Sequence, residues 1–288
     1  FDCDDSIGAT GDTPCDGWAL VQPGTFTMGT SEGEASPIPD TEAAHLVELS
    51  RPFLIMQHEV TQAQWDAASG AATNPSANAG CATCPVERVN WFEALLLANR
   101  LSAQLGLPAC YTLGECTGTF GGGCLEGEAS CSDGYRCDRA QLADEACAGV
   151  RLPTEAEWEY ATRAGTTGPF SGVLDARAWY RRTAPDTTPR PVGTLAANAW
   201  GLYDVHGNVA EWTADLFAPY GGALNVAMVD PLVWGTPADV TALASRVTRG
   251  GSVASLEDGC RSAKRAPLQP TARVATVGVR FVRAVPTP

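Results

Sequence analysis

The 288-residue chain lacks long apolar runs: no stretch approaches the roughly 18–20 consecutive apolar residues of a membrane-spanning helix. We therefore expect no transmembrane segment. No signal-peptide pattern is present and the chain begins at Phe1 without Met, which predicts a processed form. Basic residues are also scarce, since 19 Lys and Arg against 33 Asp and Glu leave a net charge of −14. Nucleic-acid binding requires a basic face, so this balance argues against a nucleic-acid partner.

Histidine and lysine are nearly missing as well. The three histidines, His45, His58 and His206, are spread along the chain, so no nucleophilic triad is visible. We expect His206 to lie on the surface or to support a neighbouring site, not to bind a metal. The chain has a single lysine, Lys264, and nothing in its surroundings marks it as catalytic. Internal repeats and low-complexity tracts are absent.

Cysteine, by contrast, is abundant. Eleven cysteines are present, and six of them crowd into residues 110–147 among Gly, Ser and Asp, which is typical of disulfides that stabilise a segment without its own core. Zinc is the alternative, but these six show no paired CxxC spacing. We predict three bridges inside 110–147, with Cys260 left unpaired, and a secreted, periplasmic or cell-surface location. The remaining bridges are predicted as Cys3–Cys15 and Cys81–Cys84, and the six clustered cysteines are Cys110, Cys116, Cys124, Cys131, Cys137 and Cys147.

The pattern of start and stop signals predicts one α+β domain over residues 18–288, preceded by a Cys-flanked arm at 1–17 and interrupted by a Cys-rich insertion at 110–149. Capping boxes begin three predicted helices, at Thr61, Asn90 and Thr154, each with Glu or Gln three residues later. Alternating or short apolar runs predict strands at 21–28, 46–49, 53–56, 246–252 and 278–284. Residues 165–200 and 213–245 are expected to have little regular structure.

The stretch Gly201–Trp212 alternates short apolar residues with Asp204, Asn208 and Glu211, whose oxygens suit a hard cation such as calcium. Two glycines, Gly201 and Gly207, allow tight turns. An ordinary hydrogen-bonded turn is the alternative, because Asp and Asn commonly bond their own backbone. The residue pattern alone leaves both interpretations open.

Eight motifs occur in order over roughly residues 18–284. They are Phe26–Gly29, Glu59–Thr61, Pro85–Trp91, Arg151–Ala161, Gly201–Trp212, Arg249–Ser252, Cys260–Ala263 and Gly278–Arg280. Together they resemble the formylglycine-generating enzyme family, also called sulfatase-modifying factors. The resemblance implies a single fold like that of C-type lectins, with little regular secondary structure. It also implies a calcium site formed by the side chains of Asp204 and Glu211 and the carbonyls of Gly207 and Val209. A second family calcium site would fall near 175–200, where no ligands match.

The residues that bind copper in that family are only partly present in this chain. Its active members oxidise a cysteine of a sulfatase peptide with Cu(I) and dioxygen, held by two thiolates three and eight residues after the serine that matches Ser252. In this chain the eighth residue is Cys260, but the third is Ser255, a poor ligand for soft Cu(I). Family tryptophans are replaced by Val253 and Ala210. Copper is therefore disfavoured, and Cys260 is interpreted first as a packing residue, then as a disulfide partner, then as a ligand.

These departures favour a calcium-stabilised binding or accessory module whose partner is a protein, a peptide or a surface ligand. The alternatives are a sulfatase-modifying or other oxidase that uses Cys260 with Ser252, and a retroelement-diversified variable binding protein of the same fold. Arg261 and Arg280 are expected to form structural salt bridges. The predicted recognition surface comprises Val253, Ala254, Ser255, Leu256, Glu257, Asp258, Ala266, Leu268, Gln269 and Thr271.

Overall fold

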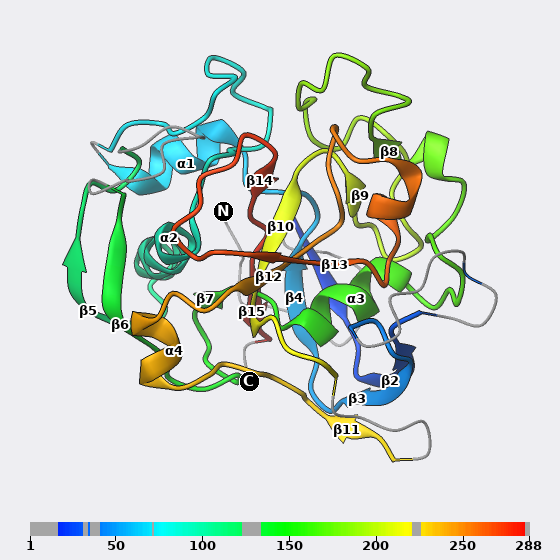
Figure 1. Cartoon of the computed structure of the whole chain (residues 1–288), viewed down its shortest axis with the longest axis horizontal. Helices are drawn as coiled ribbons and strands as arrows, with labels where there is room; N and C mark the ends of the chain where they lie inside the picture. Colours follow the sequence, from blue (N-terminus) through cyan, green and yellow to red (C-terminus); the bar gives the residue numbers. More distant parts are fainter. Residues whose placement is uncertain are drawn as a thin grey trace.

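Figure 1 shows a computed structural model of the chain in which short strands run through the centre. Three helices, α1, α2 and α4, lie on one side, α3 lies beside the central strands, and long loops occupy the other side. The helices α1 and α2 lie beside the hairpin of β5 and β6, whereas β8, β9 and their loops occupy the opposite side. The structure describes residues 17–30, 34, 41–70, 72–122, 134–220 and 226–285. Among these residues, no helix is long and apolar enough to cross a membrane.

Two four-stranded sheets form the centre of the molecule. The first has the order β1-β4-β15-β7, and its central strand β4 (Phe53–Met56) is buried along its whole length. The second has the order β13-β12-β10-β14, in which β10 (Ala210–Leu216) runs antiparallel to β12 and parallel to β14. The remaining bounds are β1 Trp18–Val21, β7 Val150–Arg151, β12 Arg246–Arg249, β13 Arg265–Leu268, β14 Val277–Gly278 and β15 Val282–Ala284.

The remaining strands of the described residues form smaller sheets. A three-stranded sheet has the order β11-β3-β2, and two further pairs are β5–β6 and β8–β9. The β5–β6 hairpin lies inside the Cys-rich insertion, so this segment has more regular structure than its composition suggests. The bounds are β2 Gly24–Met28, β3 His45–Leu49, β5 Tyr111–Thr117, β6 Arg136–Leu142, β8 Ala178–Trp179, β9 His206–Gly207 and β11 Met228–Val229.

All four α-helices of the described residues begin with a capping box. The predicted caps at Thr61, Asn90 and Thr154 are confirmed, since each side chain accepts from the third backbone N–H and the third side chain bonds back. The fourth box, at Thr236, starts a one-turn helix inside a segment predicted to be irregular. The helices are α1 Gln62–Ser69, α2 Trp91–Gln104, α3 Glu155–Arg163 and α4 Pro237–Thr241, with 3-10 turns η1 Leu174–Ala176 and η2 Glu257–Cys260.

Two buried tryptophans join α2 to β10 in the core. The Trp91 indole N–H donates to the Thr213 carbonyl at 3.0 Å, and the Trp212 indole donates to the Val89 carbonyl at 2.8 Å. Both rings are fully buried. Each tryptophan thus buries a large apolar surface while its single polar group is satisfied.

Three disulfides are present in the described residues. Cys81–Cys84 is confirmed, and Cys110–Cys147 and Cys116–Cys137 confirm bridging within 110–147. In the chain-entropy model, closing these loops of 4, 38 and 22 residues contributes about 2, 4 and 3 kcal/mol respectively. Of the three bridges, Cys81–Cys84 therefore contributes least to the free energy of unfolding. The predictions for Cys3, Cys15, Cys124 and Cys131 lie outside the described residues.

Candidate functional site

The loop that leads into β10 contains four residues with positive φ, of which Gly201 is the first, with φ of 80°. Gly207 has φ of 89°, and a Cβ there would lie 2.2 Å from the Trp179 carbonyl oxygen, so the close approach of β8 requires glycine. Asp204 and Asn208 adopt the left-handed region with φ of 59° and 53°. Asp and Asn tolerate this conformation better than most residues, which explains the loop's composition.

Three buried carboxyl groups gather around this loop and face a single buried cation, Arg280. Glu59, Asp204 and Glu211 are each at most 3% exposed, and Arg280 is fully buried. The Arg280 guanidinium donates from Nη2 and Nε to Glu211 at 2.8 and 3.0 Å. The Trp158 indole N–H donates to the same carboxylate at 2.6 Å. The predicted structural salt bridge of Arg280 is confirmed.

Glu59 closes the cluster from the other side. Its carboxylate accepts from the Val209 backbone N–H and the Asn208 side-chain amide, each at 3.3 Å. Burial, reinforced by the charge of Asp204, raises the pKa of Glu59 well above its usual range. The sequence marked Glu59 as part of a motif but gave no signal that it contacts a loop 150 residues away.

Asp204 leaves one acceptor without a partner. Its Oδ2 accepts from the Gly193 N–H at 2.7 Å, whereas Oδ1 is buried with no hydrogen-bond partner among the residues the structure describes. Burial raises the pKa of Asp204 to about 6. Three carboxylates against one guanidinium, with an unpartnered buried oxygen, is an arrangement that a divalent cation would complete.

The donor set for such a cation combines side chains and backbone. The described residues contain no cluster of three or more His, Cys, Asp or Glu side chains arranged to hold a metal. The predicted set, however, takes only two carboxylates, from Asp204 and Glu211, and two carbonyls, from Gly207 and Val209. The Glu211 carboxylate is shared with Arg280, so its charge is already partly neutralised. Asp204 is thus the carboxylate with capacity left for an ion.

The residues at the family's copper positions form a small packed turn. The Ser255 hydroxyl accepts from the Ser252 N–H at 3.0 Å and lies 3.4 Å from the Ser252 hydroxyl. Cys260 is the free cysteine of the described residues, fully buried in an apolar cluster with Leu174 and Tyr180. Burial raises the pKa of the Cys260 thiol to about 12. The packing role predicted first for Cys260 is confirmed.

His206 connects this turn to the loop within Gly201–Trp212. Its Nδ1 donates to the Cys260 carbonyl, because Nε2 accepts from the Ser171 backbone N–H at 3.1 Å. Burial lowers the pKa of His206 to about 4, so the ring is neutral at physiological pH. It is buried, not on the surface, and both ring nitrogens are used within the protein.

A cleft of about 320 Å³ lies beside these serines. Ala210, Ala266 and Val277 line it, so much of its wall is short and apolar. Ser255 and Lys264 supply polar groups at the wall. The Lys264 ammonium lies 3.4 Å from Glu42, whose carboxylate also accepts from Arg261. The chain's single lysine thus lines the cleft, which nothing in the sequence around Lys264 indicated.

The predicted recognition surface is placed only in part beside this cleft. Ser255, Ala266 and Leu268 line it. Val253 is fully buried, so its assignment to a surface is wrong; its N–H donates to the Asn208 carbonyl instead. The remaining predicted residues lie near the cleft in the chain but do not line it: Ala254, Leu256, Glu257, Asp258 and Gln269 are exposed and Thr271 is half-buried.

A second cleft, of about 260 Å³, offers less for a ligand. It is lined by Arg51, Asp230 and the buried pair Arg151–Glu157. Arg151 and Glu157 bond each other bidentately at 2.6 and 2.7 Å, and Arg51 pairs with Asp230 at 3.3 Å. Its charged groups are thus satisfied within the protein.

Comparisons with known proteins agree with this geometry. The family model described as "Sulfatase-modifying factor enzyme 1-like domain" matches residues 5–285. The formylglycine-generating enzyme of Thermomonospora curvata is 30% identical, with 92% of each chain covered. The chaperone protein LppX of Paenibacillus barcinonensis is 33% identical over 56% of this chain and 61% of its own length. Treponema denticola variable protein 1 superposes with a TM-score of 0.73 at 30% identity, covering 93% and 94% of the two chains.

The chain therefore belongs to the formylglycine-generating enzyme, or sulfatase-modifying factor, family, and its fold is of the type shared with C-type lectins. The chain spans about three-fifths of the length of the LppX relative that it matches. Family membership establishes the scaffold of the site and leaves its chemistry to the residues present. Which activity the chain retains depends on the residues described above.

The pKa of Cys260 gives a direct prediction. At pH 8 a buried thiol with a pKa of about 12 is almost entirely protonated, and the thiolate is the reactive form. We expect iodoacetamide to leave Cys260 unmodified in the folded protein and to modify it fully in denaturant, as measured by peptide mass spectrometry. Modification of the folded protein at the rate of an exposed thiol would contradict the packed position.

Proposed function

We propose that this domain is a calcium-stabilised, extracytoplasmic binding or accessory module in which the copper chemistry of the family has been lost. The observation that carries the proposal is the pair of copper positions. Ser255 offers a hydroxyl already bonded to the Ser252 N–H, and Cys260 is the one thiol at these two positions and is fully buried. Two-coordinate Cu(I) prefers a pair of soft thiolates, and a serine with a cysteine supplies at most one.

The cleft, in contrast, is available to a ligand. The residue that replaces the family's tryptophan at its wall is Ala210, which leaves apolar space beside Ala266 and Val277. Lys264 places one positive charge at the same wall, and its ion pair with Glu42 is loose at 3.4 Å. A ligand with an apolar group and an acidic group, such as a peptide side chain and carboxylate, matches this combination.

The comparisons and the cysteines support this assignment. The likeness to a variable protein is consistent with a binding role on this scaffold, and a relative named as a chaperone protein is consistent with an accessory one. Disulfides persist in oxidising compartments, which supports a secreted, periplasmic or cell-surface location. A retroelement-diversified binding protein is the special case of this proposal.

Calcium enters the proposal as a structural ion. Asp204 and Glu211, with the Gly207 and Val209 carbonyls, would hold it, and Asp204 Oδ1 is the oxygen that lacks another partner. A bound divalent cation would offset the excess of buried negative charge around Arg280. Its chemistry is electrostatic: it would hold the loop in place beside the cleft.

Chelation tests the calcium site. An ion present at 100 times its dissociation constant contributes about 2.7 kcal/mol, so for a chain of 288 residues EDTA is expected to lower the melting temperature by roughly 4–5 °C. Asp204→Asn should remove this sensitivity. Asp204 is preferred to Glu211 as the test position, because removing Glu211 also strands a buried arginine. An unchanged melting temperature after prolonged dialysis against EDTA would refute the calcium site.

The cleft is tested with 8-anilinonaphthalene-1-sulfonate, a probe that carries an aromatic body and one negative charge. We expect the folded protein to enhance its fluorescence, and Ala210→Trp, which restores the family residue and fills the cleft, to abolish the enhancement. Lys264→Met should weaken binding about tenfold while keeping the apolar wall, the loss of one charge-assisted contact. Near-ultraviolet circular dichroism checks that each variant is folded. Equal enhancement by Ala210→Trp would place the binding site elsewhere.

Turnover separates the proposal from the oxidase alternative, in which Cys260 and Ser252 would act. Incubation with Cu(I), oxygen and a Cys-x-Pro-x-Arg peptide is expected to give no aldehyde by mass spectrometry. Restoring the missing thiol with Ser255→Cys is the matched comparison. Aldehyde formed by the natural chain and lost in Cys260→Ala would overturn the proposal.

A further inference from the structure

The Cys81–Cys84 bridge has the spacing of a reducible thiol pair. The four residues Cys81-Ala82-Thr83-Cys84 form a turn in which the Cys84 N–H donates to the Cys81 carbonyl at 3.0 Å. Ala82 and Thr83 are exposed and Cys81 is half-buried, whereas Cys84 is buried. An attacking thiolate thus has access from the Cys81 side, and thiol–disulfide exchange proceeds by such an attack on a sulfur.

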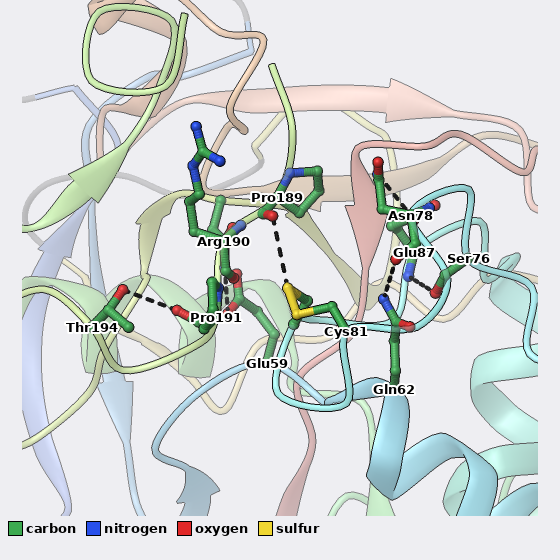
Figure 2. The surroundings of a disulfide bond; sticks show 12 residues. Glu59, Gln62, Ser76, Asn78, Cys81, Glu87, Pro189, Arg190, Pro191 and Thr194 are labelled. Atoms are coloured by element: carbon green, nitrogen blue, oxygen red, sulfur yellow. Dashed lines mark hydrogen bonds between the residues drawn. A yellow bond between two sulfur atoms is a disulfide. The ribbon is translucent and has the colours of Figure 1, made fainter. Parts of the chain in front are cut away.

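This turn is attached to one other segment far along the chain. The Val192 N–H donates to the Thr83 carbonyl at 2.9 Å, and Cys84 Sγ lies 3.8 Å from the Pro189 carbonyl oxygen. Figure 2 shows the disulfide facing Pro189, with Arg190 and Pro191 continuing toward Glu59. In the oxidised form the sulfur carries no proton, so the contact with Pro189 is one of van der Waals type, and only a reduced thiol has a proton to donate.

The same segment holds the loop of the candidate calcium site. The Arg190 N–H donates to Asn208 Oδ1 at 2.9 Å, and the Asn208 amide donates back to the Arg190 carbonyl at 3.3 Å. Two residues after Pro191, the Gly193 N–H donates to Asp204 Oδ2 at 2.7 Å. Residues 189–193 therefore lie between the disulfide turn and the loop and are hydrogen-bonded to both.

We propose that Cys81–Cys84 is a thiol–disulfide exchange site whose redox state sets the order of residues 189–193 and, through them, of the Asp204–Glu211 loop. The partner is a dithiol of the thioredoxin class. It transfers two electrons and two protons. Its thiolate attacks Cys81 Sγ to form a mixed disulfide, and Cys84 leaves as a thiolate and takes up a proton. The partner's second thiol then loses its proton and attacks the partner's own sulfur in the mixed disulfide, so that Cys81 leaves as a thiolate and is protonated, and the partner is left as a disulfide. Reduction removes the S–S bond, which frees both sulfurs to rotate and gives Cys84 a proton to donate to the Pro189 carbonyl. The turn is then no longer held in the one geometry that places the Thr83 carbonyl against the Val192 N–H.

The position of this bridge suits reversible opening. It encloses only two residues, so its reduction releases very little chain, and the turn remains tied to α1 by the Gln62 N–H on the Cys84 carbonyl. The other two bridges span the insertion, where Cys116–Cys137 joins β5 to β6. Neither is hydrogen-bonded to residues 189–193 in the part of the chain that the structure describes, which makes Cys116–Cys137 a matched control. The consequence for ligand binding rests on the proposed function, whereas the change in loop order does not.

Hydrogen exchange of the full-length chain tests the inference. Native protein is titrated with dithiothreitol, trapped by alkylation and mapped by mass spectrometry, and amide exchange is then followed in peptides covering 186–195 and 202–212, in EDTA throughout. We expect Cys81 and Cys84 to be reduced in the folded protein. Exchange in both peptides should become about tenfold faster on reduction and in Cys81→Ala/Cys84→Ala, as protection by local opening falls. Cys116→Ala/Cys137→Ala should leave both peptides unchanged.

Two results would overturn the inference: reduction of Cys81–Cys84 only under denaturing conditions, or exchange in 186–195 and 202–212 that is the same in the oxidised and reduced chains. Because EDTA is present, neither result depends on whether calcium binds. Loss of probe binding without altered exchange would count against the exchange site and leave the binding proposal standing. Altered exchange without any probe binding would support the exchange site and count against the binding proposal.

Discussion

The buried contact between Arg280 and Glu211 is the interaction on which the rest of the structure depends. Beyond the carboxylate, the guanidinium donates to the Met56 carbonyl at the end of β4 and to the Tyr203 carbonyl in the loop. One side chain thus connects both central sheets and the loop before β10. Removing one partner of such a buried pair typically costs about 3–5 kcal/mol, because the other charge is left uncompensated. The scaffold around the loop therefore depends on this pair more than on any one of its short strands.

Buried arginines repeat this role where strands are too short to hold the chain. Arg249 bonds Glu159 and the carbonyls of Ala263 and Ser262, and so fixes the turn that follows η2. Arg265 bonds Glu155 bidentately and also reaches loop carbonyls. In this fold, side-chain hydrogen bonds to loop carbonyls replace part of the backbone ladder that longer sheets would supply. Long irregular segments are therefore compatible with a single well-packed structure.

Local signals in the sequence predicted three of the four helices of the described residues, the Cys81–Cys84 bridge and bridging within 110–147, because capping boxes and close cysteines act over a few residues. The short helix at Thr236 and the pairing of the clustered cysteines were not predicted. The widely separated partners were not accessible in the same way. Nothing at Glu59 points to Val209, and nothing at Lys264 points to a cleft, since both depend on how distant loops cross. The buried position of Val253 had the same origin: neighbours of Ser252 in sequence face opposite directions once the turn is packed. The hairpin in the insertion was hidden by a composition typical of loops.

The capping boxes have a further consequence for how this fold changes over evolutionary time. Each helix supplies its own first hydrogen bonds, so its start does not depend on the length or sequence of the preceding connection. When each helix forms its own N-terminal cap, the connection between two helices can lengthen without changing the residue at which either helix begins. The cysteine-rich insertion occupies just such a connection, between α2 and α3. The fold is therefore permissive to insertion at connections that lie away from the contact in which Arg280 joins its sheets.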